Sequence, residues 1–192
     1  MYKKTSVIGV AMGLVMTITL GSAAAFDIPY RGTISGSFIS TEIDAVNPGD
    51  GVKAILGIFA VTTRHLGQVT AQALVEDVPA TSPSGLCPPG TDQELALGTV
   101  RAVHRFANGD LLFLKLLART ACIDFQTLTA LAFEKGEFTG GTGRFAQATG
   151  SFTATSTAEI FVADPAGRVF GPFSGTIDGT ISLPAPIPHG GE

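Results

Sequence analysis

Basic residues are few in this sequence, and they never form a run. Twelve lysines and arginines stand against 16 aspartates and glutamates among the 192 residues. Nucleic acids and anionic membrane surfaces are bound by clustered lysine and arginine side chains. The composition therefore excludes both as partners, and the acidic balance suits a solvated extracellular protein.

Motifs that carry catalysis or bind cofactors are also missing. The sequence contains no G-x-S-x-G, H-E-x-x-H or C-x-x-C. The stretch Gly140–Gly143 lacks the Lys-Ser/Thr that ends a P-loop, and no helix is expected after it. Two cysteines without a histidine or cysteine at ligand spacing do not make a zinc site. We therefore predict no metal and no cofactor, and leave open whether the protein is an enzyme.

Only one long apolar run occurs, and it lies at the start of the chain. Lys3 and Lys4 precede the run Val7–Leu20, and small residues follow it up to Ala25. This order is typical of a secretory signal peptide of residues 1–25. The alternative, a membrane anchor, is disfavoured because the run is short and no cationic stop follows. We expect a secreted protein, extracellular or periplasmic, without a membrane span after cleavage and with a net charge of −6.

The two cysteines, Cys87 and Cys122, both lie in the exported part. Because export leads to an oxidising compartment, the pair predicts one disulfide, with two separate buried thiols as the alternative. The bridge would close a loop of about 36 residues and stabilise the fold by roughly 3–4 kcal/mol in the chain-entropy model.

The exported sequence alternates between apolar and polar residues and is rich in threonine, phenylalanine, valine, isoleucine and glycine, which are strand and turn residues. We predict an all-β domain at residues 26–183, followed by a disordered Pro/Gly-rich tail at residues 184–192. The expected strands are Tyr30–Ser40, Lys53–Thr63, Leu66–Asp77, Glu94–Phe106, Leu111–Ala121, Phe125–Phe138, Ser151–Ala163 and Phe170–Leu183. Asn108-Gly109 predicts a type I′ hairpin turn, and a proline-rich loop is expected from Pro79 to Asp92.

About eight strands in up-and-down order suffice to close a barrel. Gly32–Ser37 near the start resembles Gly175–Thr180 near the end, and each carries two glycines on one strand face. Glycines there suit a sharp bend or a close backbone approach where the barrel closes. We therefore predict an antiparallel up-and-down β-barrel closed by these two strands, with an open sandwich as the alternative.

Several stretches together carry a resemblance to known proteins. They are Arg64–Gly67, Ala107–Asp110 with Leu112, Gly140–Ala146, Ala148–Phe152 and Phe173–Ile177. The chain resembles a group of small secreted bacterial proteins without known activity over most of residues 53–182. More distantly, it is similar to the calycin-type barrel that plant allene oxide cyclases and dirigent proteins share.

The resemblance implies a barrel fold and an oligomer, but not cyclase chemistry, because no cyclase active-site motif can be matched and fold does not imply function. Arg64 stands where the bacterial group usually has a small threonine. Gln68-Val69 replaces a basic-aromatic pair. These departures weaken the transfer of any surface site.

Three residues are weak candidates for ligand binding. His65 lies at a strand break and suits either a pocket-mouth base or a turn histidine bonded to a backbone carbonyl. Arg144 suits either an anion contact or a donor that holds its turn by bonding Asp110. Glu134 is a site candidate if its strand face is interior and an ordinary acid if it is exterior. His104, beside Arg105, is expected to point outward.

Leu111–Ala121 is the strand with two apolar faces. The first face carries Leu112, Leu114, Leu116 and Ala118; the second carries Leu111, Phe113 and Leu117, interrupted by Lys115 and Arg119. Two such faces predict either a homo-oligomer interface or cover by the proline-rich loop. Three functions follow in order: non-catalytic binding of a small apolar ligand, a structural or envelope-associated oligomeric module, and an isomerase or cyclase-like enzyme.

Overall fold

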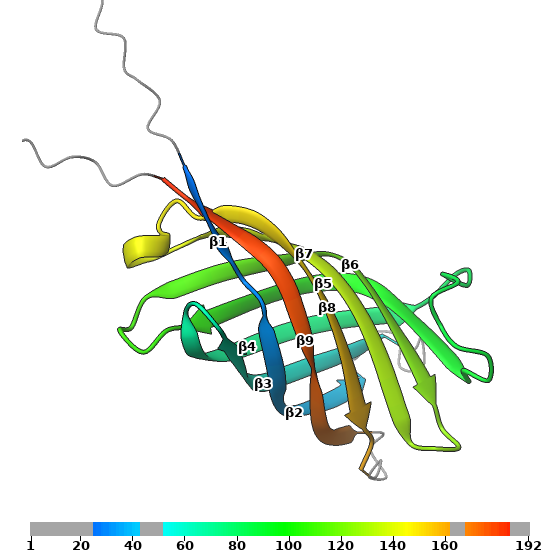
Figure 1. Cartoon of the computed structure of the whole chain (residues 1–192). Coiled ribbons are helices and arrows are strands. Elements are labelled where there is room, and N and C mark those ends of the chain that lie inside the picture. The colour runs from blue at the N-terminus through cyan, green and yellow to red at the C-terminus, as the bar shows by residue number, and fades with distance from the viewer. Residues whose placement is uncertain (1–24, 43–51, 162–167, 185–192) are drawn as a thin grey trace, which may run out of the picture.

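The computed structural model describes residues 25–42, 52–161 and 168–184, so the predicted signal peptide and tail lie almost wholly outside the described residues. These described segments form a single antiparallel sheet (Figure 1). Its strands are β1 (Phe26–Pro29), β2 (Gly32–Glu42), β3 (Lys53–Thr63), β4 (Gly67–Pro79), β5 (Gln93–Arg105), β6 (Leu111–Asp124), β7 (Thr129–Gly141), β8 (Thr149–Glu159) and β9 (Val169–Leu183). A short 3-10 helix, η1 (Gly143–Phe145), connects β7 to β8.

The sheet closes into an eight-stranded barrel. From β2 to β9 every strand pairs with the next one along the chain, and β9 pairs with both β8 and β2. The closing pair brings Ile34 opposite Gly175 and Gly36 opposite Phe173. The predicted closure by Gly32–Ser37 and Gly175–Thr180 is therefore confirmed.

The strand β1 was not predicted from the sequence. It pairs with the last residues of β9, from Phe26 opposite Leu183 to Pro29 opposite Thr180. The chain then enters the barrel wall as β2, so the first and last strands, β1 and β9, run side by side (Figure 1). With four residues and a proline, β1 is too short for its alternation to stand out.

Glycine is required where the closing strands bend. A Cβ at Gly36 would lie 2.3 Å from the Cβ of Phe59, and one at Gly175 would lie 2.2 Å from the carbonyl oxygen of Thr155. Both distances are far below van der Waals contact, so any side chain would push neighbouring strands apart. The expectation of a close backbone approach at these glycines is met.

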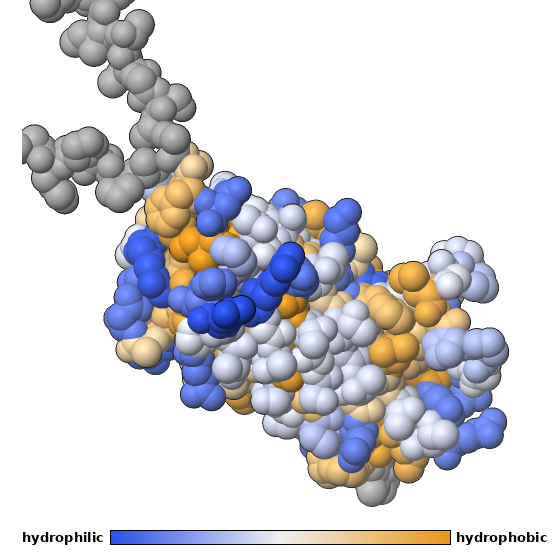
Figure 2. Space-filling model, in the orientation of Figure 1, coloured by the Kyte–Doolittle hydropathy of each residue, from blue (hydrophilic) through white to orange (hydrophobic). Residues whose placement is uncertain are grey.

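The outer wall is polar where β8 and β9 face solvent. Outward residues of these strands are exposed and small, among them Thr153, Thr155, Thr157, Ser174 and Thr176. The face seen in Figure 2 accordingly shows mostly intermediate hydropathy. Inward neighbours such as Phe152 and Ile177 are buried, which is the alternation of a strand with one solvated face.

The hairpin at Asn108-Gly109 forms, but not as the predicted type I′ turn. Only Gly109 takes a positive φ, of 88°, and Asn108 does not. The Asn108 carboxamide oxygen instead accepts a hydrogen bond from the backbone N–H of Asp110 at 3.2 Å. Such a side-chain bond favours a turn in which a single glycine takes the left-handed conformation.

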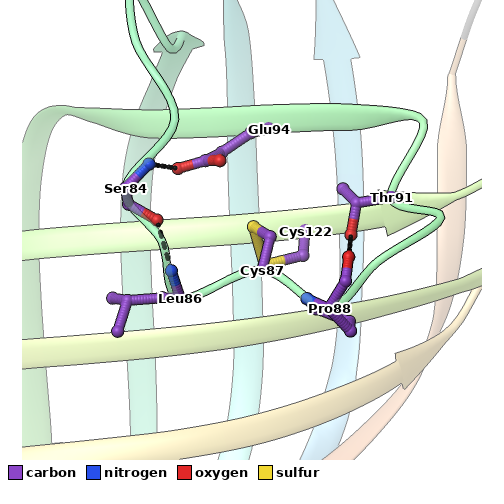
Figure 3. The surroundings of a disulfide bond; sticks show 7 residues. All are labelled: Ser84, Leu86, Cys87, Pro88, Thr91, Glu94 and Cys122. Carbon is purple, nitrogen blue, oxygen red and sulfur yellow. Dashed lines mark hydrogen bonds between the residues drawn. A yellow bond between two sulfur atoms is a disulfide. The ribbon is translucent and has the colours of Figure 1, made fainter.

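The predicted disulfide is present and ties the proline-rich loop to the barrel wall. Cys87 and Cys122 are bonded, with Cα atoms 5.5 Å apart. Glu94 of β5 accepts a hydrogen bond with its carboxylate from the backbone N–H of Ser84 in the loop, and within the loop the Thr91 hydroxyl donates one to the carbonyl of Pro88 (Figure 3). Cys122 is only 4% exposed, because the loop covers this outward position of β6.

Candidate functional site in the barrel cavity

One end of the barrel interior is filled by large side chains. Tyr30 and Phe145 are fully buried there, and Phe106 is 3% exposed. The rings of Phe106 and Phe145 lie 4.4 Å apart, and the Arg144 guanidinium covers both. The helix η1 thus acts as a plug, because it carries Phe145 into the end of the barrel.

The other half of the interior is hollow. A cavity of about 370 Å³ extends along it, walled mainly by aliphatic and aromatic side chains, including Ile55, Val100, Ala102, Leu116, Ala132 and Phe173. Its lining reaches Phe125 in the β6–β7 turn, which is 54% exposed. The cavity therefore approaches the surface at the end opposite the plug.

His104, which is paired with Tyr30 of the filled half, forms the floor of the cavity where the two halves of the barrel meet. His104 lines the cavity, and its Nδ1 lies 2.6 Å from the Tyr30 hydroxyl oxygen. Phe59 packs edge-on against the imidazole. Burial lowers the pKa of His104 to about 3 and raises the pKa of Tyr30. The imidazole is consequently neutral at physiological pH, and it is a hydrogen-bonding group rather than a cation.

A cluster of three ionisable side chains lies on the wall of the cavity. Arg119 donates from Nη1 to the Asp77 carboxylate and from Nε to Glu134 Oε1, the latter at 2.9 Å. Asp77 is fully buried, Arg119 is 11% exposed and Glu134 is 24% exposed. Burial raises the pKa of Asp77, although the Arg119 charge opposes this shift. Among the described residues, Asp77 Oδ1 has no hydrogen-bond partner.

A β-bulge turns Arg119 into the barrel. In β6, Leu112, Leu114 and Leu116 point inward by ordinary alternation. The register with β7 then shifts between Leu116 and Ala118, which adds one residue to β6 and inverts the alternation. Arg119 therefore faces the cavity and Ala118 faces outward, opposite to the orientation that strict alternation predicts.

A second bulge lies beside Asp77. The β4–β5 register shifts between Val75 and Asp77, where Val75 faces Val100 and Asp77 faces Leu97. The two bulges place the ionic cluster at the same level of the barrel, next to the positions where pairing is interrupted. Bulges near functional sites commonly re-aim side chains in this way.

The structure separates the three residues predicted as ligand contacts. Glu134 faces the interior and lines the cavity. His65 is exposed in the turn between β3 and β4, at the filled end and away from the cavity. Arg144 is exposed at the same end, where its Nε lies 3.8 Å from Asp110 Oδ2. This ion pair is the contact with Asp110 that the second interpretation of Arg144 proposes.

Sequence reasoning missed three residues of the cavity. His104 was expected to point outward and is 2% exposed inside the barrel. Arg119 was expected on the second apolar face of its strand, opposite the face that carries Leu114 and Leu116, and Asp77 was not singled out. For His104 and Asp77 the sequence offered an indication. Each lies two residues after an inward apolar residue of its strand, Ala102 and Val75 respectively, and alternation therefore places it on the same inward face. For Arg119 none existed, since the sequence does not reveal the bulge.

Comparisons with known proteins reveal a similar barrel but no relative of known function in sequence. Fold and site together define a closed antiparallel eight-stranded barrel with a cavity in one half. No family model and no curated relative matches the sequence. The chain is similar to the solved structures of the pterocarpan synthase dirigent proteins PsPTS1 and GePTS1, at 12% and 13% identity. These matches cover 84% and 90% of this chain and 97% of each of those chains, with TM-scores of 0.46 and 0.41.

Among the described residues, no three histidine, cysteine or acidic side chains lie close enough to hold a metal ion. Within the same residues, no helix is sufficiently long and apolar to cross a membrane.

Proposed function

We propose that the protein is a secreted, non-catalytic binding protein that holds a small apolar molecule in the hollow half of its barrel. The observation that carries this proposal is the cavity of about 370 Å³ with its mainly apolar wall. Ligand pockets in proteins typically measure roughly 300–1,000 Å³ and combine apolar walls with few polar groups. Residues 1–25 and the disulfide support export to an oxidising compartment.

Binding is tested with a neutral fluorescent probe, N-phenyl-1-naphthylamine, titrated into the protein recovered from the cells that export it. We expect saturable fluorescence enhancement with one probe per chain. Native mass spectrometry of the same preparation would also reveal a retained small molecule. A protein that gives no enhancement and carries no molecule would exclude the proposed function.

A pair of adjacent substitutions locates the probe. Ala102 lines the cavity, and Val103 follows it on β5 with its side chain on the outer face. Ala102→Phe should abolish enhancement by occupying the cavity, while Val103→Phe should leave it unchanged. Circular dichroism verifies that both variants are folded, and equal losses would place the probe outside the cavity.

A second candidate function is an oligomeric structural module, supported by the outer face of β6. Phe113 and Leu117 are 39% and 48% exposed there, and apolar residues on a solvated strand face favour association. Light scattering at increasing protein concentration tests it. An integer multiple of the chain mass that Phe113→Ser abolishes would support the module, and a monomer at all concentrations would exclude it.

A further inference from the structure

The ionic cluster on the cavity wall contains more acid than base. Two carboxylates, Asp77 and Glu134, share the single guanidinium of Arg119. With all three groups ionised, the cluster carries one uncompensated negative charge beside an apolar cavity. An uncompensated charge in such surroundings is strongly destabilised unless a proton or a cationic partner neutralises it.

The remaining polar groups that line the cavity do not neutralise the excess negative charge of the cluster. Lys53 also lines the cavity, pairs with Asp77 in the β3–β4 register and takes part in another interaction, but the charges that act on the Asp77 carboxyl are those of Arg119 and Glu134. His104 is neutral, as its lowered pKa requires. Within the part of the chain that the structure describes, the fully buried Asp77 retains one carboxylate oxygen without a hydrogen-bond partner. The cluster therefore lacks hydrogen-bond donors rather than acceptors.

The two carboxylates differ in what they offer a ligand. Glu134 is 24% exposed, and its exposed part faces the cavity. Asp77 is sealed behind Arg119 and occupies that cation. Asp77 thereby prevents the guanidinium from acting as a free anion site, and Glu134 is left as the acceptor that a ligand reaches.

We infer that the molecule bound in the cavity is a small apolar amine whose protonated nitrogen contacts Glu134. This inference rests on the proposed function and adds the chemical class of the ligand. A protonated nitrogen both donates hydrogen bonds and neutralises the excess charge of the cluster. A neutral hydroxyl group only donates, and a carboxylate adds a second like charge, which is disfavoured at short range in a low dielectric.

Three ligands with the same eight-carbon chain separate these cases: n-octylamine, 1-octanol and octanoate. At pH 7 a primary alkylamine is protonated, as a lysine side chain is. Each compound is used to displace N-phenyl-1-naphthylamine from the protein. We expect octylamine to bind at least tenfold more tightly than octanol and octanoate to bind most weakly.

The substitution Glu134→Gln tests the contact itself. Glutamine keeps an oxygen that accepts from Arg119 Nε but removes the charge, so the preference for octylamine over octanol should fall to less than about threefold. Glu137→Gln is the matched control, because Glu137 lies on the same strand, points outward and pairs with Lys115 at 3.6 Å. The control should retain the full preference, and both variants should still bind the fluorescent probe.

The outcomes distinguish this inference from the proposed function. Octanol or octanoate binding as tightly as octylamine, or an amine preference that survives in Glu134→Gln, overturns the amine inference and leaves a cavity for apolar molecules. Probe binding without displacement by octylamine also overturns it. A protein that binds neither the probe nor any octyl compound would refute the proposed function itself.

Discussion

The two halves of the barrel are built from the same strands but differ in how their interiors are filled. In the filled half, the plug η1 and the rings of Tyr30, Phe106 and Phe145 leave no space. In the hollow half, alanines such as Ala102 and Ala132 stand at inward positions and leave the cavity open. Large packed side chains are therefore concentrated at one end of this barrel, and the other end carries polar groups and empty volume.

Removing a large ring should separate the halves most strongly. Phe145→Ala leaves a void in the filled half and should lower the free energy of unfolding by about 4 kcal/mol. Phe173→Ala, on the wall of the cavity, removes a partly exposed ring and should cost about 2 kcal/mol. Urea denaturation measures both, and equal losses would contradict a division into filled and hollow halves.

The ionic cluster should be the point in the hollow half that is most sensitive to substitution. Arg119→Met leaves two carboxylates without their cation and should lower the free energy of unfolding by about 3 kcal/mol at pH 7. The loss should shrink at pH 4, where the carboxylates take up protons. Lys135→Met, at an exposed position on β7, is the control and should have little effect. A loss below about 1 kcal/mol for Arg119→Met would contradict a buried cluster.

His104 at the junction of the halves should make stability depend on pH. Burial lowers its pKa from 6.5 to about 3, so below pH 6.5 the unfolded chain binds a proton that the folded protein does not. The stabilisation is complete above pH 6.5 and is lost as the pH falls, by about 1.4 kcal/mol per pH unit. Denaturation curves between pH 6.5 and 4.5 measure it. The variant His104→Gln should lack this component, and parallel pH profiles would show that His104 titrates in the folded state.

The smallest expected effect has opposite signs in the two halves. Ala102→Val extends into the cavity and should raise the free energy of unfolding by about 0.5–1 kcal/mol, as cavity-filling substitutions do. Ala148→Val adds the same two carbons to the filled half, where Ala148 is 1% exposed, and should lower it by about 1 kcal/mol through overpacking. Thermal unfolding of both variants compares them, and a stabilising Ala148→Val would mean that the plug leaves space.

Alternation along the chain was sufficient to predict the barrel but not its site. The bounds of β3 were predicted correctly, and the closing pair was indicated by the paired glycines of β2 and β9. The interior polar residues were largely missed, because hydropathy assigns Arg119 and His104 to solvent. A single extra residue in β6 reverses the face of Arg119, and no local property of the sequence marks that insertion. Glu134 was singled out because alternation places it on the same strand face as the apolar residues Ala130 and Ala132.

Closure of the barrel by β2 and β9 also constrains the order in which the strands can pair during folding. Ser35 pairs with Ser174, so the seam joins residues that are far apart in the sequence. Until β9 has emerged, β2 has an unpaired edge, and such edges invite pairing with other chains. Contacts so distant in sequence slow folding, because loop-closure entropy is lost before they form. The seam is therefore a late step of folding, and the nascent protein is most prone to aggregate just before its last fifteen-residue strand arrives.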